Sequence, residues 1–187
     1  MKVLAISGSL RRDSLNARLL RAAAELAPSG VEVELLDPSV LKELPIYDQD
    51  DDGVTPPVAA RRLRGAIRLA DAILIATPEY NGTIPGGLKN AIDWGSRPFR
   101  EAALTHKPAA VIGASTGLFG AVWAQAETRK SLSIAGAEVL EDEFPLGQAD
   151  TAFGDDGLLL EPELNERLTE IVAELAKLHE RETAAAA

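Results

Sequence analysis

Cysteine is missing from this sequence altogether, and several other residue types are scarce. Without a thiol the chain can form no disulfide, hold no metal through thiolates and use no cysteine nucleophile. Histidine occurs only twice, and aromatic residues make up 4% of the chain. The sequence offers no convincing Ser-His-Asp set and no spacing typical of metal ligands. We therefore predict no catalytic side chain and no bound metal.

Positive charge and long apolar runs are also in short supply. The chain has 19 Lys and Arg against 29 Asp and Glu, a net charge of -10. Nucleic acids and anionic membrane surfaces favour a basic face, so we expect neither as a partner. No apolar run approaches the roughly 20 residues that span a bilayer, and no signal peptide is evident. The plain expectation is a cytoplasmic protein.

The order of elements predicts one α/β domain over residues 1–187. Apolar patterning predicts five strands alternating with five helices, and therefore a parallel sheet with helices on both faces in strand order 2-1-3-4-5. The strands are expected at 2–7, 31–37, 71–77, 109–115 and 137–142. The helices are expected at 14–27, 58–70, 85–96, 118–135 and 161–182, and 38–57 is expected to be a long loop. In such sheets ligands bind beyond the carboxyl ends of the strands.

The turn SGSLRRDSLN, between the first strand and the first helix, gathers donors and positive charge. A helix N-terminus attracts anions through its unpaired N–H groups. Ser9, Ser14 and Asn16 add hydroxyl and amide donors, and Arg11 or Arg12 adds a guanidinium that can clasp two phosphate oxygens. Ser14 alone would be explained as a helix cap, but the whole cluster predicts a phosphate site.

Two familiar nucleotide patterns do not occur in that turn. It has neither the GK[ST] of nucleoside triphosphatases nor the G-x-G-x-x-G of dinucleotide-binding folds. With only Gly8 in the turn, side chains must supply most of the contacts, which favours a terminal monophosphate. Asp37 stands where a ribose-binding acid would be, but without the glycine pattern we interpret it as a turn residue.

Two further turns follow the third and fourth expected strands. The first of these, TPEYNGTIPGG, has the rigid Pro78, the ring of Tyr80 and a tight-turn pair, Asn81-Gly82. The second, GASTGLFG at 113–120, has small residues that let a ligand approach the backbone closely. Together the three turns predict a pocket for a planar ring with a phosphate tail.

The stretches GSLRRDSLN, PEYNGTIPGGLKNAIDW with SRP following, and GASTGLFG resemble the NADPH-dependent FMN reductase family, whose relatives include quinone and chromate reductases. The resemblance runs in order from Lys2 to about Phe144. It implies a flavodoxin-like fold, bound FMN, and NADPH or NADH as hydride donor. The cofactor-binding residues that it implies are Ser9, Arg11, Ser14, Leu15, Asn16, Pro78, Glu79, Tyr80, Asn81, Ser115 and Gly117.

The resemblance also implies a reaction: FMN takes hydride from a nicotinamide and passes electrons to a quinone or similar small-molecule acceptor. Azo dyes, metal oxyanions and free flavin stay open as acceptors. A flavodoxin-like electron carrier and a non-catalytic FMN-binding module are the alternatives. Against the carrier, the chain shows no evident pair of aromatic residues to cover the ring.

Self-association is the last expectation. The apolar stripe of the helix after Pro85 includes Trp94, and that of the helix after Gly117 includes Phe119 and Trp123. A helix that covers a sheet needs a single stripe, and both tryptophans extend theirs. The family resemblance implies dimers, sometimes paired into tetramers. We therefore predict a two-fold homodimer built on these two helices, or a homotetramer; the alternative is that both indoles complete the core.

Overall fold

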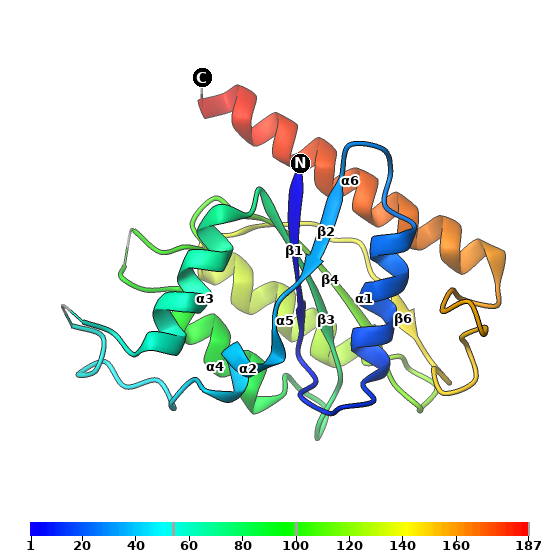
Figure 1. Cartoon of the computed structure of the whole chain (residues 1–187), viewed down its shortest axis with the longest axis horizontal. Helices are drawn as coiled ribbons and strands as arrows, with labels where there is room; N and C mark the ends of the chain where they lie inside the picture. The colour runs from blue at the N-terminus through cyan, green and yellow to red at the C-terminus, as the bar shows by residue number, and fades with distance from the viewer. Residues whose placement is uncertain (54, 100, 187) are drawn as a thin grey trace.

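A computed structural model of the chain describes residues 1–53, 55–99 and 101–186 (Figure 1). The strands are β1 (Lys2–Ser7), β2 (Glu32–Leu35), β3 (Ala72–Thr77), β4 (Pro108–Ala114), β5 (Glu138–Val139) and β6 (Pro145–Leu146). The helices are α1 (Leu15–Glu25), α2 (Pro38–Lys42), α3 (Val58–Leu69), α4 (Gly86–Gly95), α5 (Val122–Ile134) and α6 (Pro162–Ala186).

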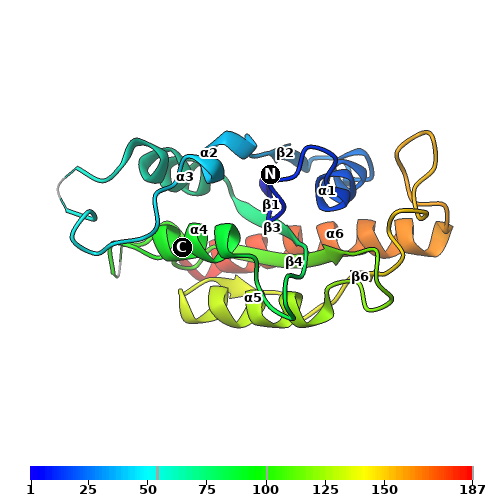
Figure 2. The same cartoon turned by 90° about the horizontal axis from the view of Figure 1, so that it is seen from below.

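The strands form one parallel sheet in the order β2-β1-β3-β4-β5, which confirms the predicted topology (Figure 2). The prediction of a continuous fifth strand at 137–142 is wrong. Two short strands, β5 and β6, pair with opposite ends of β4 instead. The acidic residues between them take partners outside the sheet: Asp142 pairs with Arg167 of α6 and Glu143 with Arg129 of α5.

Helices cover the sheet on both faces, so the apolar core has two parts. One part packs α1 and α6 against the sheet, and the other packs α2, α3, α4 and part of α5 against it. Side chains of β3 and β4 are buried on both faces, as their unbroken apolar sequences require. None of the helices that the structure describes is long and apolar enough to cross a membrane.

The sequence predicted a loop throughout residues 38–57. This prediction is wrong for the first residues, because they form α2. Asp37 caps this helix by accepting a hydrogen bond from the Ser39 backbone N–H at 2.8 Å. This hydrogen bond holds the pKa of the Asp37 carboxyl below its usual value. Asp37 is therefore a turn and capping residue, as interpreted from the sequence.

Residues 43–53 follow α2, and among them Pro45 and Tyr47 contact α4 and cover Trp94, which is fully buried. The Trp94 indole N–H donates to Pro45 O at 2.9 Å, and the Tyr47 ring meets the indole edge-on at 4.9 Å between centroids. Asn90 donates to Pro45 O and accepts from Tyr47 N. The prediction that Trp94 extends α4 into a dimer surface is wrong, because this segment buries it within the same chain.

Candidate functional site

Three turns lie at the carboxyl edge of the sheet, at the bottom of Figure 1: one after β1, one after β3 and one after β4. The first two are in direct contact. Gly8 N donates to Ala76 O at 2.8 Å, and a Cβ on Gly8 would lie 2.9 Å from Leu88 Cδ2 and 3.2 Å from Pro78 Cδ. Glycine at this position therefore lets the first turn pack directly on the second.

Asn16 joins the first turn to the third. Its side-chain amide donates to Ala114 O at 2.9 Å and accepts from Ala114 N at 2.9 Å, and both bonds are buried. These paired bonds fix the start of α1 against the end of β4. We therefore assign Asn16 a positioning role within the site.

Glu79 joins the second turn to the start of α5, the helix that follows the third turn. Its carboxylate accepts hydrogen bonds from the Trp123 and Ala124 backbone N–H groups, both at 3.1 Å. The α5 helix begins at Val122, later than the predicted 118, and follows Ala121 in a left-handed conformation with no side-chain cap of its own. Glu79 replaces that cap, and its negative charge suits the helix N-terminus.

The first turn has the features of an anion site. Ser14 is the N-cap of α1, as predicted, and its hydroxyl accepts from Ala17 N at 3.1 Å. The first N–H groups of a helix have no acceptor within the helix and can therefore bind a ligand. Arg11 folds back over the turn and donates to Asp13 O at 2.8 Å. Ser9 is buried, and Leu15 is half-buried against the core.

The second turn is a tight hairpin with an exposed aromatic ring. Tyr80 and Thr83 exchange two backbone hydrogen bonds, both 3.2 Å. Between them Asn81 and Gly82 have φ values of 55° and 74°, a conformation that Asn and Gly tolerate well. Pro78 is buried, whereas Tyr80 is 52% exposed, so the hairpin presents its ring at the sheet edge.

The third turn rests on a segment that sequence reasoning missed. Gly117 O accepts from Gln148 N at 3.0 Å and from the Ser115 hydroxyl at 3.3 Å. A Cβ on Gly147 would lie 2.3 Å from Leu118 O, so only glycine allows this close packing. This segment includes Gly147 and Gln148 and follows β6. The sequence signals that could have indicated it are Pro145 and Gly147, shortly after Phe144.

The structure thus brings every predicted cofactor-binding residue to one edge of the sheet. Asn16 and Glu79 are already hydrogen-bonded to other turns, which favours a positioning role for both. The contacts of all these residues with a ligand stay predictions. His106 and His179 lie away from this edge, as the sequence indicated, because one precedes β4 and the other belongs to α6.

Comparison with known proteins places these features in context. The family described as NADPH-dependent FMN reductase matches residues 1–151. An NAD(P)H-dependent FMN reductase of Pseudomonas aeruginosa is 44% identical over 89% of this chain and 88% of its own length. A quinone reductase of Pseudomonas putida is 40% identical over 84% of this chain and 83% of its own. The structure of FerB from Paracoccus denitrificans, a flavoenzyme NAD(P)H:(acceptor) oxidoreductase, superposes with a TM-score of 0.85 at 36% identity, covering 97% of this chain and 98% of FerB.

Proposed function

This chain belongs to the NADPH-dependent FMN reductase family, and we propose that it is an FMN-dependent NAD(P)H oxidoreductase that delivers electrons to a quinone or a similar small acceptor. Bound FMN supplies the chemistry, namely hydride acceptance from the nicotinamide and electron transfer to the acceptor. The protein binds and orients the reactants. The cytoplasmic location expected from the sequence stays a prediction.

The observation that carries this proposal is the direct linkage of the three turns. Gly8, Asn16 and Glu79 connect them in pairs, so a helix N-terminus, an exposed tyrosine and a glycine-rich backbone are held in fixed relation. The donors of the first turn fit a monophosphate. The hairpin and the third turn fit a flat heteroaromatic ring, to which their backbone groups offer hydrogen bonds. Fixed donors cost little reorganisation when charge develops on a ring.

The test combines a visible spectrum with a turnover assay. We expect the purified protein to show a flavin spectrum, alone or after addition of FMN, and to oxidise NADPH or NADH steadily when benzoquinone is present. A carrier would bind FMN but turn over the nicotinamide poorly. A binding module would give the spectrum and no turnover. Either result would overturn the enzymatic proposal, and failure to bind FMN would overturn the whole assignment.

Replacing Arg11 with alanine should weaken FMN binding by about 1.5–3 kcal/mol, the range for a hydrogen bond to a charged group. Arg11 is an exposed cation in the phosphate-binding turn, and its guanidinium already folds over that turn. Titration of apo-protein with FMN and with riboflavin measures the effect. Arg21→Ala, which removes the same charge from an exposed position further along α1, is the matched control.

The comparison with riboflavin decides whether Arg11 contacts the phosphate. We expect the affinity for riboflavin, which has no phosphate, to change little in Arg11→Ala, and Arg21→Ala to bind both ligands like the parent. Equal weakening of FMN and riboflavin would show that Arg11 shapes the turn rather than binds the phosphate.

A second copy of this chain is the partner that we propose for the exposed apolar surface beside the site. Leu118, Phe119 and Trp123 are 74%, 63% and 51% exposed, and the rings of Phe119 and Trp123 lie 5.2 Å apart. Exposed apolar clusters of this kind mark interaction surfaces. The backbone N–H of Trp123 also donates to the Glu79 carboxylate, so this surface lies directly beside the second turn. A dimer here would shield the open face of the bound ring.

Light scattering at low micromolar concentration should therefore report at least twice the chain mass. Trp123→Glu should shift the protein towards monomer, because it places a charge in the apolar contact. Leu69→Glu, at an apolar residue that is 84% exposed at the end of α3, should leave the mass unchanged. A fully active monomer of the parent protein would contradict the proposed dimer.

A further inference from the structure

The amino edge of the sheet lies at the top of Figure 1. A second group of polar side chains lies at this edge, near the start of β4 and the end of α6. The two histidines of the chain, far apart in sequence, line the same hollow of about 630 Å³. His106 precedes β4, and His179 belongs to α6. This hollow lies at the opposite end of the strands from the three turns, so the proposed flavin chemistry does not account for it.

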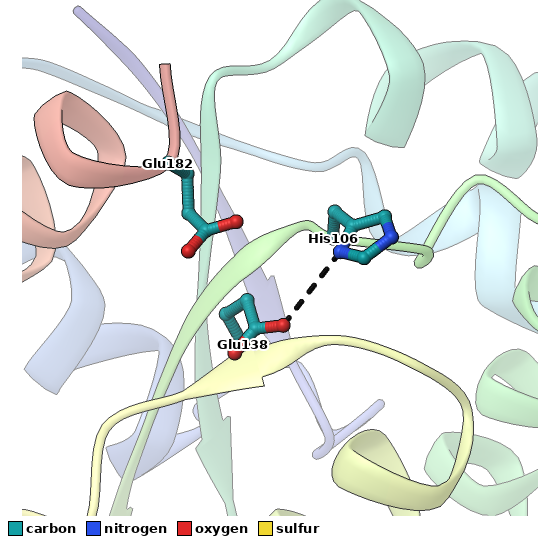
Figure 3. A group of neighbouring side chains, drawn as sticks. All are labelled: His106, Glu138 and Glu182. Carbon is teal, nitrogen blue, oxygen red and sulfur yellow. Dashed lines mark ion pairs between the residues drawn. The ribbon is translucent and has the colours of Figure 1, made fainter. Parts of the chain in front are cut away.

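His106 lies close to two glutamates at this edge (Figure 3). Glu138 begins β5 and Glu182 belongs to the last turns of α6. One ligand atom of each of the three side chains lies within 4.8 Å of the others, and His106 Nδ1 lies 3.7 Å from Glu138 Oε1. In Figure 3 the three side chains converge on a common point from three separate elements.

The backbone fixes two of these three residues. His106 has a φ of 54°, an uncommon conformation for a residue with a side chain, and its N–H donates to Gly136 O at 2.7 Å. Glu138 N donates to Lys107 O at 3.1 Å, in the pairing of β5 with β4. The imidazole and one carboxylate are thus positioned by the sheet, and α6 supplies the other carboxylate.

Among the described residues, the Lys and Arg side chains that line the hollow form no ion pair with Glu138 or Glu182. Lys107 donates its Nζ proton to Ala70 O, and Arg68 donates to Glu101 O at 3.3 Å. Asp71 accepts from Lys2 N at 2.7 Å. Lys107 and Arg68 donate to backbone oxygens rather than to these carboxylates, so the negative charge of Glu138 and Glu182 favours a cation bound between the two carboxylates and the imidazole.

We propose that His106, Glu138 and Glu182 bind a divalent transition-metal ion, best matched by Zn²⁺. One imidazole nitrogen and two carboxylate oxygens form a mixed set that suits zinc better than Mg²⁺ or Ca²⁺, which prefer oxygen alone. Two ligands at about 2.1 Å from a tetrahedral zinc lie about 3.4 Å apart, so the glutamate side chains rotate to bring the three ligand atoms from within 4.8 Å to that spacing. Water fills the remaining coordination position. The ion fastens the end of α6 to the sheet.

The test is a zinc titration of the full chain, stripped of metal by a chelator, in competition with a chromogenic chelator. We expect one Zn²⁺ per chain, and no displacement by equimolar Mg²⁺. His106→Asn should lower the zinc affinity at least about tenfold because it removes one of three protein ligands. His179→Asn is the matched control: it removes the other histidine of the hollow but no member of the cluster, so its affinity should stay within about twofold of the parent. The absence of cysteine excludes competing thiolates.

Hydrogen exchange supplies a second measurement that does not depend on affinity. Zn²⁺ should slow amide exchange over residues 177–183 in the parent protein, because binding fastens this part of α6, and should have no such effect in Glu182→Gln. Equal loss of affinity in His106→Asn and His179→Asn would overturn the proposed ligand set. So would unchanged exchange in the zinc-loaded parent. FMN binding and turnover are measured separately, so neither result bears on the flavin proposal.

Discussion

Trp94→Ala is expected to lower the free energy of unfolding by about 3–5 kcal/mol, the range for deleting a large aromatic side chain from a core. Trp94 is among the largest fully buried side chains of the protein. Its removal leaves a cavity beneath Pro45 and Tyr47 and deprives Pro45 O of the indole N–H. Chemical denaturation monitored by circular dichroism measures the loss.

Trp94→Phe separates the two parts of that effect. Phenylalanine keeps an aromatic ring against Tyr47 but donates no hydrogen bond, so we expect a smaller loss than in Trp94→Ala. The opposite order, or a loss below about 1 kcal/mol in Trp94→Ala, would contradict the proposed anchoring of Pro45 and Tyr47 by the indole.

Residues 43–53 show what sequence patterns could not reveal. Their composition predicted a loop without a signature, and nothing local indicates that they close over α4. Asp52 makes a buried ion pair with Arg64 of α3 at 2.8 Å, and Arg64 in turn donates to Trp94 O. Removing either partner of such a buried pair destabilises the fold, because the other charge is left buried and unpaired. Such contacts join residues far apart in sequence, which periodicity does not detect.

Regular elements were more predictable because their signals are local. The unbroken apolar runs of β3 and β4 predicted buried central strands, and Ser14 marked the start of α1. The alternation of strands and helices then fixed a parallel sheet whose three turns meet at one edge. The predicted start of α5 was wrong for a physical reason. The cap of this helix is Glu79, from another turn, so no capping residue directly precedes the helix in the sequence.

In the candidate site, too, local features were predictable from the sequence and long-range contacts were not. A polar cluster at a strand-to-helix turn can be recognised from sequence, but the partner of each side chain cannot. The sequence predicts Asn16 as one more phosphate donor beside Ser14, whereas in the structure its side-chain amide is hydrogen-bonded to the backbone of Ala114. His106, Glu138 and Glu182 show no ligand spacing at all, because three separate elements bring them together.

Asn16→Ala is expected to lower the free energy of unfolding by about 2–6 kcal/mol, because it leaves the Ala114 N–H and C=O buried without their partners and each unpaired group costs about 1–3 kcal/mol. The same change should weaken FMN binding in protein that is still folded. Without the two bonds, the start of α1 is no longer held against β4, and the first turn, proposed to bind the phosphate, loses its fixed position relative to the third turn. Denaturation and FMN titration below the unfolding transition measure the two effects.

Asn90→Ala is the matched control for this prediction, since Asn90 also joins two segments through both ends of its amide. It lies on α4, and its two bonds go to Pro45 and Tyr47 rather than to the first turn. We expect Asn90→Ala to lose stability without losing FMN affinity, whereas Asn16→Ala loses both. If folded Asn16→Ala bound FMN as tightly as the parent, the start of α1 would not depend on Ala114 for its position, and the linkage of the first and third turns would be irrelevant to binding.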